Sequence, residues 1–411
     1  MTPISKDFAP PLKLVAPFFK TGVIFYLIAM MALLAFSATF SYQEMAVAGW
    51  VHLFLLGFVM VIIFGAMAQL IPVVLEVGHA IVDLYYVILP LLAIGTIVMI
   101  IGFWIEPALL PYGGLLVLVS MITFALEAFV TLKKAEIKTL TVKTVAVTNA
   151  YLLVGILTGF AIALGLNGTL SIDVDTMLKA HVYAVIGGFV LLTVMGFSMT
   201  LLPMFSLAHG FDDKAVKTGF NLVAMGVGMV FISALIGIES VQWLGYIVTL
   251  VGVVFYIYQI YIIYKLTVRK EMDIWAKSML FGFSSLILSL LLGVVYLLGA
   301  SEPWLHTSVW FFMLGFIGFL INGHLYKIVP FLVWFERFAP LVGKEKVPML
   351  HEMYPKRKAE MMFWYSSGGT ILGGIGLLVQ SDFLFNAGSA FMAVGAIFLY
   401  LSMREMLGYG E

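Results

Sequence analysis

The chain has 411 residues, 63% of them hydrophobic and 11% charged, with a mean hydropathy of +1.10 and a formal net charge of +0 at pH 7. Soluble domains average roughly 25% charged residues, so this composition excludes a soluble protein and indicates a polytopic membrane protein. The balanced charge favours neither a nucleic acid nor an acidic protein as partner. The sequence contains no cysteine, which excludes disulfides, thiolate nucleophiles and Cys-bound metal clusters.

A helix needs roughly 20 apolar residues to cross a bilayer. Twelve apolar runs reach this length, which predicts an all-α membrane protein with twelve transmembrane helices in a single domain over residues 1–411. In chain order the runs lie near residues 18–40, 48–75, 80–104, 112–132, 144–166, 178–206, 217–237, 242–265, 277–299, 303–336, 361–380 and 383–405. The second, sixth and tenth runs are the longest.

Lysine and arginine concentrate in alternate turns between these runs. With the N-terminus placed in the cytoplasm, 21 of the 22 basic residues fall on or near the cytoplasmic side, and Lys179 alone lies outside. The opposite turns carry acidic residues such as Asp175 and Glu239. The positive-inside rule therefore predicts that both termini are cytoplasmic. We expect an integral protein of a bacterial or archaeal inner (cytoplasmic) membrane.

One motif occurs three times, in the second, sixth and tenth runs. It consists of Gly-Phe, six residues, Gly, six residues and Pro, and it covers residues 57–72, 188–203 and 315–330. The copies start 131 and 127 residues apart, which corresponds to four spans per period. The sequence thus predicts three parallel repeats, near 15–135, 140–270 and 275–405, with pseudo-threefold symmetry. Glycine permits close helix contact and proline favours a kink.

This organisation resembles the catalytic subunit of the haem–copper oxidases, subunit I. That family has twelve helices in three four-helix arcs, with metal ligands on helices 2, 6 and 10. The segment HLFLLGFVMVIIFGAMAQLIPVV is similar to its helix 2, and TSVWFFMLGFIGFLINGHLYKIVPF is similar to its helix 10. Short relatives include membrane haem proteins of the nitric oxide response, the NnrS family. The resemblance covers nearly the whole chain in architecture, and only short motifs in sequence.

Each repeat helix carries one histidine near its outer end. His52, His181 and His306 precede the proline of their copy by 20, 22 and 24 residues. An ionisable group inside a membrane is a candidate functional site; the alternative is an interfacial histidine that hydrogen-bonds to the backbone. At about 100° per residue, His52 and His306 project in similar directions, and His181 points nearly opposite.

The resemblance implies a role for each of these histidines. His52 and His306 correspond to the axial ligands of a low-spin haem b, and His181 stands where helix 6 of the family supplies a copper ligand, so it is a candidate ligand of a second haem or metal. Lys179 is either a partner of a haem propionate or a solvated lysine. Helix 7 lacks the family's histidine pair, so we expect copper to be absent or substoichiometric.

These assignments imply redox or electron-transfer chemistry, with nitric oxide or oxygen as the gas and an unidentified electron donor. The alternative is a non-redox twelve-helix carrier or scaffold. On the inner side, Glu127 is expected to extend its carboxylate to the membrane interface, with a proton path as the alternative. His79 and His209 are interpreted as cytoplasmic anchors.

Overall fold

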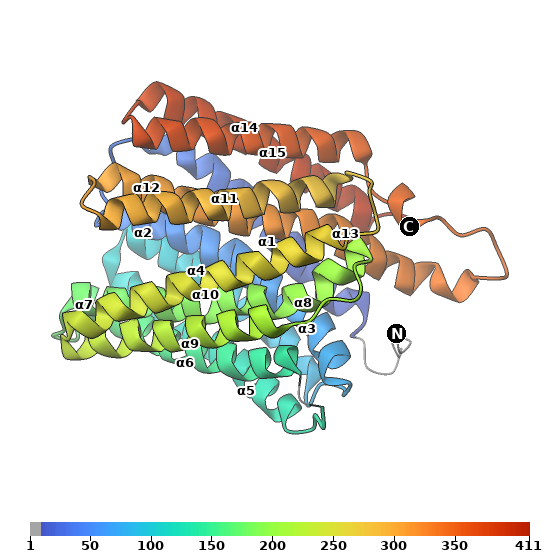
Figure 1. Cartoon of the computed structure of the whole chain (residues 1–411), viewed down its shortest axis with the longest axis horizontal. Coiled ribbons are helices and arrows are strands. Elements are labelled where there is room, and N and C mark those ends of the chain that lie inside the picture. The colour runs from blue at the N-terminus through green and yellow to red at the C-terminus, as the bar shows by residue number, and fades with distance from the viewer. Residues whose placement is uncertain (1–9, 138) are drawn as a thin grey trace. The chain divides into compact units, whose positions relative to one another are not determined.

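The computed structural model describes residues 10–137 and 139–411, and its regular elements are all helical (Figure 1). The first third of the chain forms α1 (Leu12–Ala32), α2 (Met45–His52), η2 (Leu53–Met60), α3 (Val61–Leu75), α4 (Tyr85–Trp104) and α5 (Leu110–Leu132). The second third forms α6 (Leu140–Leu166), α7 (Val174–Val182), η5 (Tyr183–Leu191), α8 (Leu192–Ser206), α9 (Lys214–Ile236) and α10 (Glu239–Lys265). The last third forms α11 (Ile274–Leu297), α12 (Glu302–Trp310), η6 (Phe311–Gly318), α13 (Phe319–Arg337), α14 (Lys356–Leu378) and α15 (Asp382–Leu407).

Eleven helices among the described residues are long and apolar enough to cross a membrane, which shows an integral membrane protein. They coincide with eleven of the twelve predicted spans. The remaining prediction, 361–380, falls on α14, which is a helix of 23 residues but begins with Lys356, Arg357 and Lys358 and is not among the eleven. The twelfth crossing and the pseudo-threefold arrangement of arcs therefore remain predictions.

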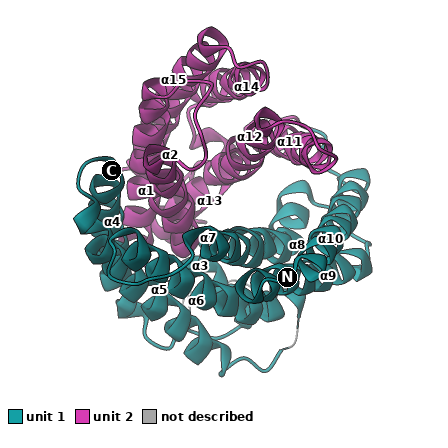
Figure 2. Cartoon of the chain, turned by 90° about the vertical axis from the view of Figure 1, so that its left-hand side faces the viewer, with its two compact units in different colours: residues 1–10, 66–270 teal, residues 11–65, 271–411 magenta. Residues whose placement is uncertain are grey.

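The chain divides into two compact units (Figure 2). Unit 1 comprises Met1–Pro10 and Ala66–Lys270, and unit 2 comprises Pro11–Gly65 and Glu271–Glu411. His181, His79 and Glu127 belong to unit 1, whereas His52 and His306 both belong to unit 2. The prediction of a single domain over the whole chain is not tested by this division.

The three copies of the Gly-Phe motif share an unusual backbone conformation. Each lies in a long helix that is α-helical at its N-terminal end, π-helical over residues 53–60, 183–191 and 311–318, and α-helical again toward its proline. π-Helical segments are rare and occur most often at functional sites. The Gly-Phe pair lies inside the π-helical segment in every copy. The internal repeat is therefore a feature of the backbone as well as of the sequence.

The motif glycines also make the same contact in each copy. A Cβ at Gly57 would lie 2.6 Å from Phe25 of α1, and one at Gly315 would lie 2.6 Å from Ser285 of α11. The corresponding glycine of the second copy faces Tyr151 of α6. The second motif glycine of each copy faces the same three helices. Gly65, Gly196 and Gly323 contact Phe18, Thr144 and Ser278 in that order. Each repeat helix is thus seated on the first helix of its own repeat, because the glycines leave no side chain between them.

The last two helices of each repeat also pack closely through glycine. In unit 1, a Cβ at Gly226 of α9 would lie 2.7 Å from the Gly245 carbonyl of α10. In unit 2, a Cβ at Gly369 of α14 would lie 2.6 Å from the Gly388 carbonyl of α15. Because an added Cβ would lie this close to a carbonyl of the other helix, the two backbones are in contact and lipid is excluded from between them. α14 therefore makes the same kind of contact as α9, which is among the eleven candidate spans.

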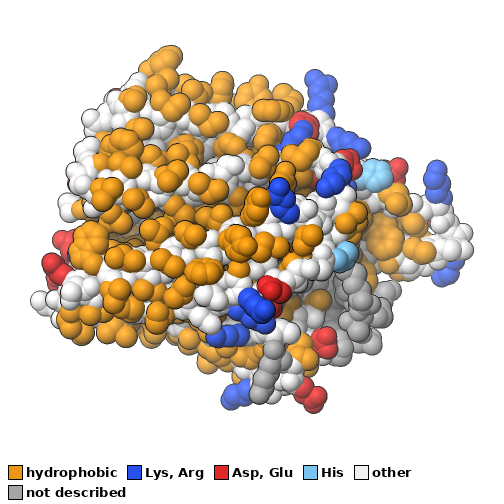
Figure 3. Space-filling view, in the orientation of Figure 1, with side chains coloured by type: hydrophobic (Ala, Val, Ile, Leu, Met, Phe, Trp, Pro, Cys, Tyr) orange, Lys and Arg blue, Asp and Glu red, His pale blue; other side chains and the backbone are white. Residues whose placement is uncertain are grey.

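Charged side chains separate along the helices. On the face drawn in Figure 3, lysine and arginine gather toward the right-hand ends of the helices, and acidic side chains alone mark the left-hand ends. Acidic residues also stand at helix starts: Asp173 caps α7, and Glu239 and Asp382 lie in the first turns of α10 and α15. A carboxylate at a helix start is stabilised by the positive end of the helix dipole. This separation agrees with the charge pattern read from the sequence.

Candidate functional site

His52 is the last residue of α2, directly before the π-helical segment of the first repeat helix. Its Nδ1 lies 2.7 Å from the Ala48 carbonyl, one turn earlier. Because a carbonyl only accepts hydrogen bonds, Nδ1 carries the proton and the lone pair of the neutral ring is on Nε2. The same arrangement orients most histidines that ligate metals through Nε2. Beside it, the Trp50 indole donates to the Ala29 carbonyl at 2.9 Å and ties α2 to α1.

His306 lies in α12, and its Nε2 is buried without a hydrogen-bond partner among the described residues. The imidazole stacks on the Phe40 ring, with centroids 5.1 Å apart and an interplanar angle of 28°, and the Tyr42 ring meets it edge-on at 6.4 Å. An unpaired buried polar atom costs about 1–3 kcal/mol. A ligand at Nε2 would remove that cost, so this nitrogen fits an axial ligand of a haem iron.

The loop between α1 and α2 positions Phe40 against His306. The Ala38 amide donates to the Asp382 carboxylate at 2.7 Å, and the Phe40 ring also meets Phe385 of α15 at 6.4 Å. Sequence reasoning missed Phe40 and Asp382, because 344 residues separate the amide from the carboxylate that holds it. The loop thus links the start of α15 to the ring that orients His306.

The directions expected for the three histidines rest on an assumption about helix rotation that the backbone does not meet. That assumption is about 100° per residue throughout, whereas each repeat helix contains 8 or 9 π-helical residues, which turn less per residue. The assumed rotation per residue therefore does not hold through these segments, and the expected relative directions of the three histidines stay a prediction. The placement of His52 and His306 in the same compact unit is independent of that assumption.

His181 of α7 is held by its own unit. Its Nδ1 lies 2.7 Å from the Gly155 carbonyl of α6, and a Cβ at Gly159 would lie 2.6 Å from the imidazole Cε1. The ring therefore occupies the space that Gly159 leaves on α6. This contact satisfies Nδ1 through the backbone, as the interfacial alternative requires, and places the lone pair of the neutral ring on Nε2, as a ligand requires.

Lys179 is exposed on α7, two residues before His181. Asp173 lies nearby, and its carboxylate accepts a hydrogen bond from the Thr176 hydroxyl at 2.6 Å. This hydrogen bond is the main cause of the lowered pKa of Asp173, and the charge of Lys179 makes a smaller contribution. A propionate contact for Lys179 stays a prediction. Within residues 10–137 and 139–411, no three His, Asp or Glu side chains are grouped closely enough to hold a metal ion together.

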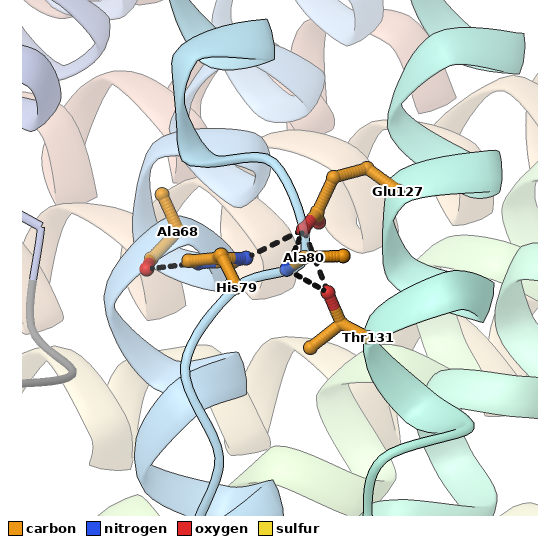
Figure 4. A network of polar contacts seen from close by, with 5 residues as sticks. All are labelled: Ala68, His79, Ala80, Glu127 and Thr131. Atoms are coloured by element: carbon orange, nitrogen blue, oxygen red, sulfur yellow. Dashed lines mark hydrogen bonds and ion pairs between the residues drawn. The ribbon is translucent and has the colours of Figure 1, made fainter.

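A second polar cluster lies in unit 1, where the turn after α3 meets α5 (Figure 4). His79 Nδ1 lies 3.0 Å from Glu127 Oε1, and His79 Nε2 lies 2.8 Å from the Ala68 carbonyl. Glu127 Oε1 also accepts the Thr131 hydroxyl at 2.7 Å and the Ala80 amide at 3.1 Å. The side chains of His79 and Glu127 are only 2% and 0% exposed.

The hydrogen bonds place one proton of this pair. The Ala68 carbonyl only accepts, so His79 Nε2 carries a proton, and Nδ1 shares a second proton with Glu127 Oε1. The same Glu127 oxygen also accepts hydrogen bonds from the Thr131 hydroxyl and the Ala80 amide. The expectation that Glu127 reaches the membrane interface is wrong, because its carboxylate is buried in this network. His79 is likewise buried and paired, whereas His209 is exposed as an anchoring residue would be.

The sequence matches no protein-family profile and no curated protein. Among solved structures, the chain is similar to a haem–copper terminal oxidase whose dimer was determined by cryo-electron microscopy. The TM-score is 0.64 at 11% sequence identity, over 97% of this chain and 84% of that chain. The chain is thus an integral membrane protein with the fold of a haem–copper terminal oxidase.

Proposed function

We propose that this chain is a membrane redox protein that binds haem b between His52 and His306. The observation that carries the proposal is the buried, unpartnered Nε2 of His306, in the same compact unit as a second histidine whose Nδ1 is fixed by a backbone carbonyl. Both stand in the N-terminal parts of repeat helices, before the π-helical segments. The oxidase-like fold supports the same assignment.

The residues around the two histidines have defined tasks in this proposal. The Ala48 carbonyl holds the His52 ring in one tautomer and raises its basicity as a ligand. Phe40 restricts rotation of the His306 ring, and Asp382 restrains the loop that carries Phe40. A haem held by two imidazoles supplies one-electron transfer between its ferrous and ferric states.

The test is a pyridine haemochrome assay with metal analysis on the purified protein. We expect haem b, and we expect His52→Ala and His306→Ala each to lose the low-spin Soret band while the protein remains inserted in the membrane. His351→Ala, at an exposed position of the short helix 350–352, is the matched control and should keep the spectrum. A His52→Ala protein with an unchanged spectrum would remove His52 from the site. Purified protein without haem would leave the carrier or scaffold alternative.

We further propose that His181 ligates a second haem or metal that reacts with nitric oxide or oxygen, with copper absent or substoichiometric. The Nδ1 contact with Gly155 leaves Nε2 as the nitrogen that would ligate. Reduced protein should then bind carbon monoxide or nitric oxide, and His181→Ala should abolish this binding without changing the low-spin band. Gas binding that survives His181→Ala would place the open iron elsewhere. The same proposal includes an electron donor that is not identified and a location in a bacterial or archaeal cytoplasmic membrane.

A further inference from the structure

A cleft of about 420 Å³ opens in unit 1 between the N-terminal ends of α6 and α9. Its lining residues are Thr139, Leu140, Val142, Lys143, Lys217 and Asn221. The first four come from the start of α6 and the other two from the first turns of α9. Both helices are candidate membrane spans, so the cleft lies where two crossings begin. It is large enough for the polar head of a lipid.

The charges that line the cleft are positive. Lys143 Nζ donates to the neutral Asn221 Oδ1 at 2.7 Å, and no ion pair between Lys143 and an acidic group occurs among the described residues. Lys217 is balanced in part by Asp213, 2.9 Å away and four residues earlier. The N-terminal ends of α6 and α9 add the positive ends of two helix dipoles. The cleft therefore carries a net positive potential that suits an anionic group.

The surroundings of the cleft are apolar. Leu140 and Val142 line the cleft. Further along α6 and α9, apolar side chains such as Leu157 and Met225 are exposed. A ligand that matches this surface has a negative head and a long apolar tail. A free anion would use the lysines alone and leave the apolar surface uncovered.

We propose that this cleft is a binding site for an anionic glycerophospholipid. The phosphodiester lies between Lys143 and Lys217, the Asn221 and Thr139 side chains contact the polar part of the head, and the acyl chains follow the exposed sides of α6 and α9. Clusters of lysine at the cytoplasmic end of membrane helices attract anionic lipids in this way. The site is independent of haem binding.

The test uses full-length protein in a mild detergent, with phosphatidylglycerol or phosphatidylcholine added. Native mass spectrometry counts retained lipids, and thermal unfolding reports stabilisation. We expect unmodified protein to retain one phosphatidylglycerol in preference to phosphatidylcholine. The double variant Lys143→Ala/Lys217→Ala should bind phosphatidylglycerol at least roughly tenfold more weakly. Lys214→Ala is the matched control, because Lys214 is exposed on the same helix, pairs with Asp212 and does not line the cleft.

Three outcomes would overturn the proposal. The first is equal retention of phosphatidylglycerol by the double variant and by Lys214→Ala. The second is equal retention of the two lipids by unmodified protein. The third is stabilisation by inorganic phosphate alone that matches the effect of phosphatidylglycerol, which would indicate a simple anion site. If the double variant unfolds in detergent, Lys143→Gln with Lys217→Gln, which keeps the side-chain stems, takes its place and is expected to give the same loss.

Discussion

The buried pair of His79 and Glu127 is the most fully connected polar group among the candidate residues. One hydrogen bond joins the two side chains, and three more join the pair to α3, to the following turn and to Thr131 of α5. Glu127→Gln keeps the shape of the side chain but replaces the carboxylate that contacts His79 with a neutral amide. Because hydrogen bonds to charged groups contribute about 1.5–3 kcal/mol, we expect the free energy of unfolding to fall by roughly that amount. Thermal or denaturant unfolding of purified protein measures it.

Glu136→Gln is the matched control for this measurement. Glu136 is exposed in the turn that follows α5, so its substitution removes the same charge without breaking a buried network. The control should unfold like the unmodified protein. Equal stability of the two variants would show that the His79–Glu127 pair contributes nothing measurable and that its hydrogen bonds are replaced by water.

The contact between Gly159 and His181 gives a second prediction at the scale of a residue. A methyl group at position 159 would lie 2.6 Å from the imidazole Cε1 and 2.9 Å from Nδ1. Gly159→Ala should therefore displace the ring and break its 2.7 Å contact with the Gly155 carbonyl. We expect nuclear magnetic resonance of labelled histidine to report a changed His181 environment. Gly368→Ala, where a Cβ meets only Phe391 at 3.7 Å, should leave the histidine signals unchanged.

The sequence predicted candidate residues better than it predicted their partners. The spacing before the motif prolines singled out His52 and His306, because position along a helix is a local property. The partners are not local: Phe40 reaches His306 from a loop, and Glu127 lies 48 residues after His79. Such contacts depend on how helices pack, and one sequence carries no direct signal for them.

At the scale of an element, the Gly-Phe motif predicted the repeat and the close helix contacts, but it gave no indication of the π-helical segments. A π-helix differs from an α-helix in its hydrogen-bond register, which the spacing of Gly, Phe and Pro does not encode. The sequence therefore identified which helices are equivalent and failed to predict how far each one rotates. For this reason the rotation of about 100° per residue that was assumed for the histidines does not apply along the whole of each repeat helix.

The seat of Gly315 on α11 can be tested with a pair of substitutions. A Cβ at Gly315 would meet the Cβ and the hydroxyl oxygen of Ser285 at 2.6 Å. The Ser285 Cβ is fixed by the α11 backbone, so rotation of the side chain does not relieve this contact. Gly315→Ala should cost about 1–3 kcal/mol of unfolding free energy through overpacking. The double variant Gly315→Ala/Ser285→Gly restores the space and should recover part of that loss. A double variant less stable than Gly315→Ala alone, by the full cost of Ser285→Gly, would exclude direct contact.

For the whole molecule, composition and hydropathy predicted an all-helical membrane protein, and the motif spacing led to the resemblance that the oxidase-like fold supports. Hydropathy works here because every buried backbone group in a bilayer must be satisfied within a helix. It is least informative for α14, where basic and small polar residues dilute the apolar signal. Whether α14 crosses the membrane depends on its contacts with α15, which hydropathy does not measure.

The topology itself is testable on the naturally cysteine-free chain. Asp175 and Glu345 are exposed, in the first turn of α7 and in the turn before the short helix η8 (Leu350–Glu352). Single cysteines at these positions should react with a membrane-impermeant maleimide from opposite sides, with position 345 cytoplasmic. Labelling of both positions from one side would contradict the predicted arrangement of inner and outer turns.

The π-helical segments also bear on the history of the chain. A short π-helical segment amounts to an α-helix with an inserted residue, and three separate insertions at the same place are less economical than one insertion copied twice. Tandem duplication of a four-helix unit would account for all three segments with a single insertion. The histidines stand 5, 7 and 9 residues before the Gly-Phe pair. The backbone feature is therefore shared more closely among the three copies than the positions of the histidines.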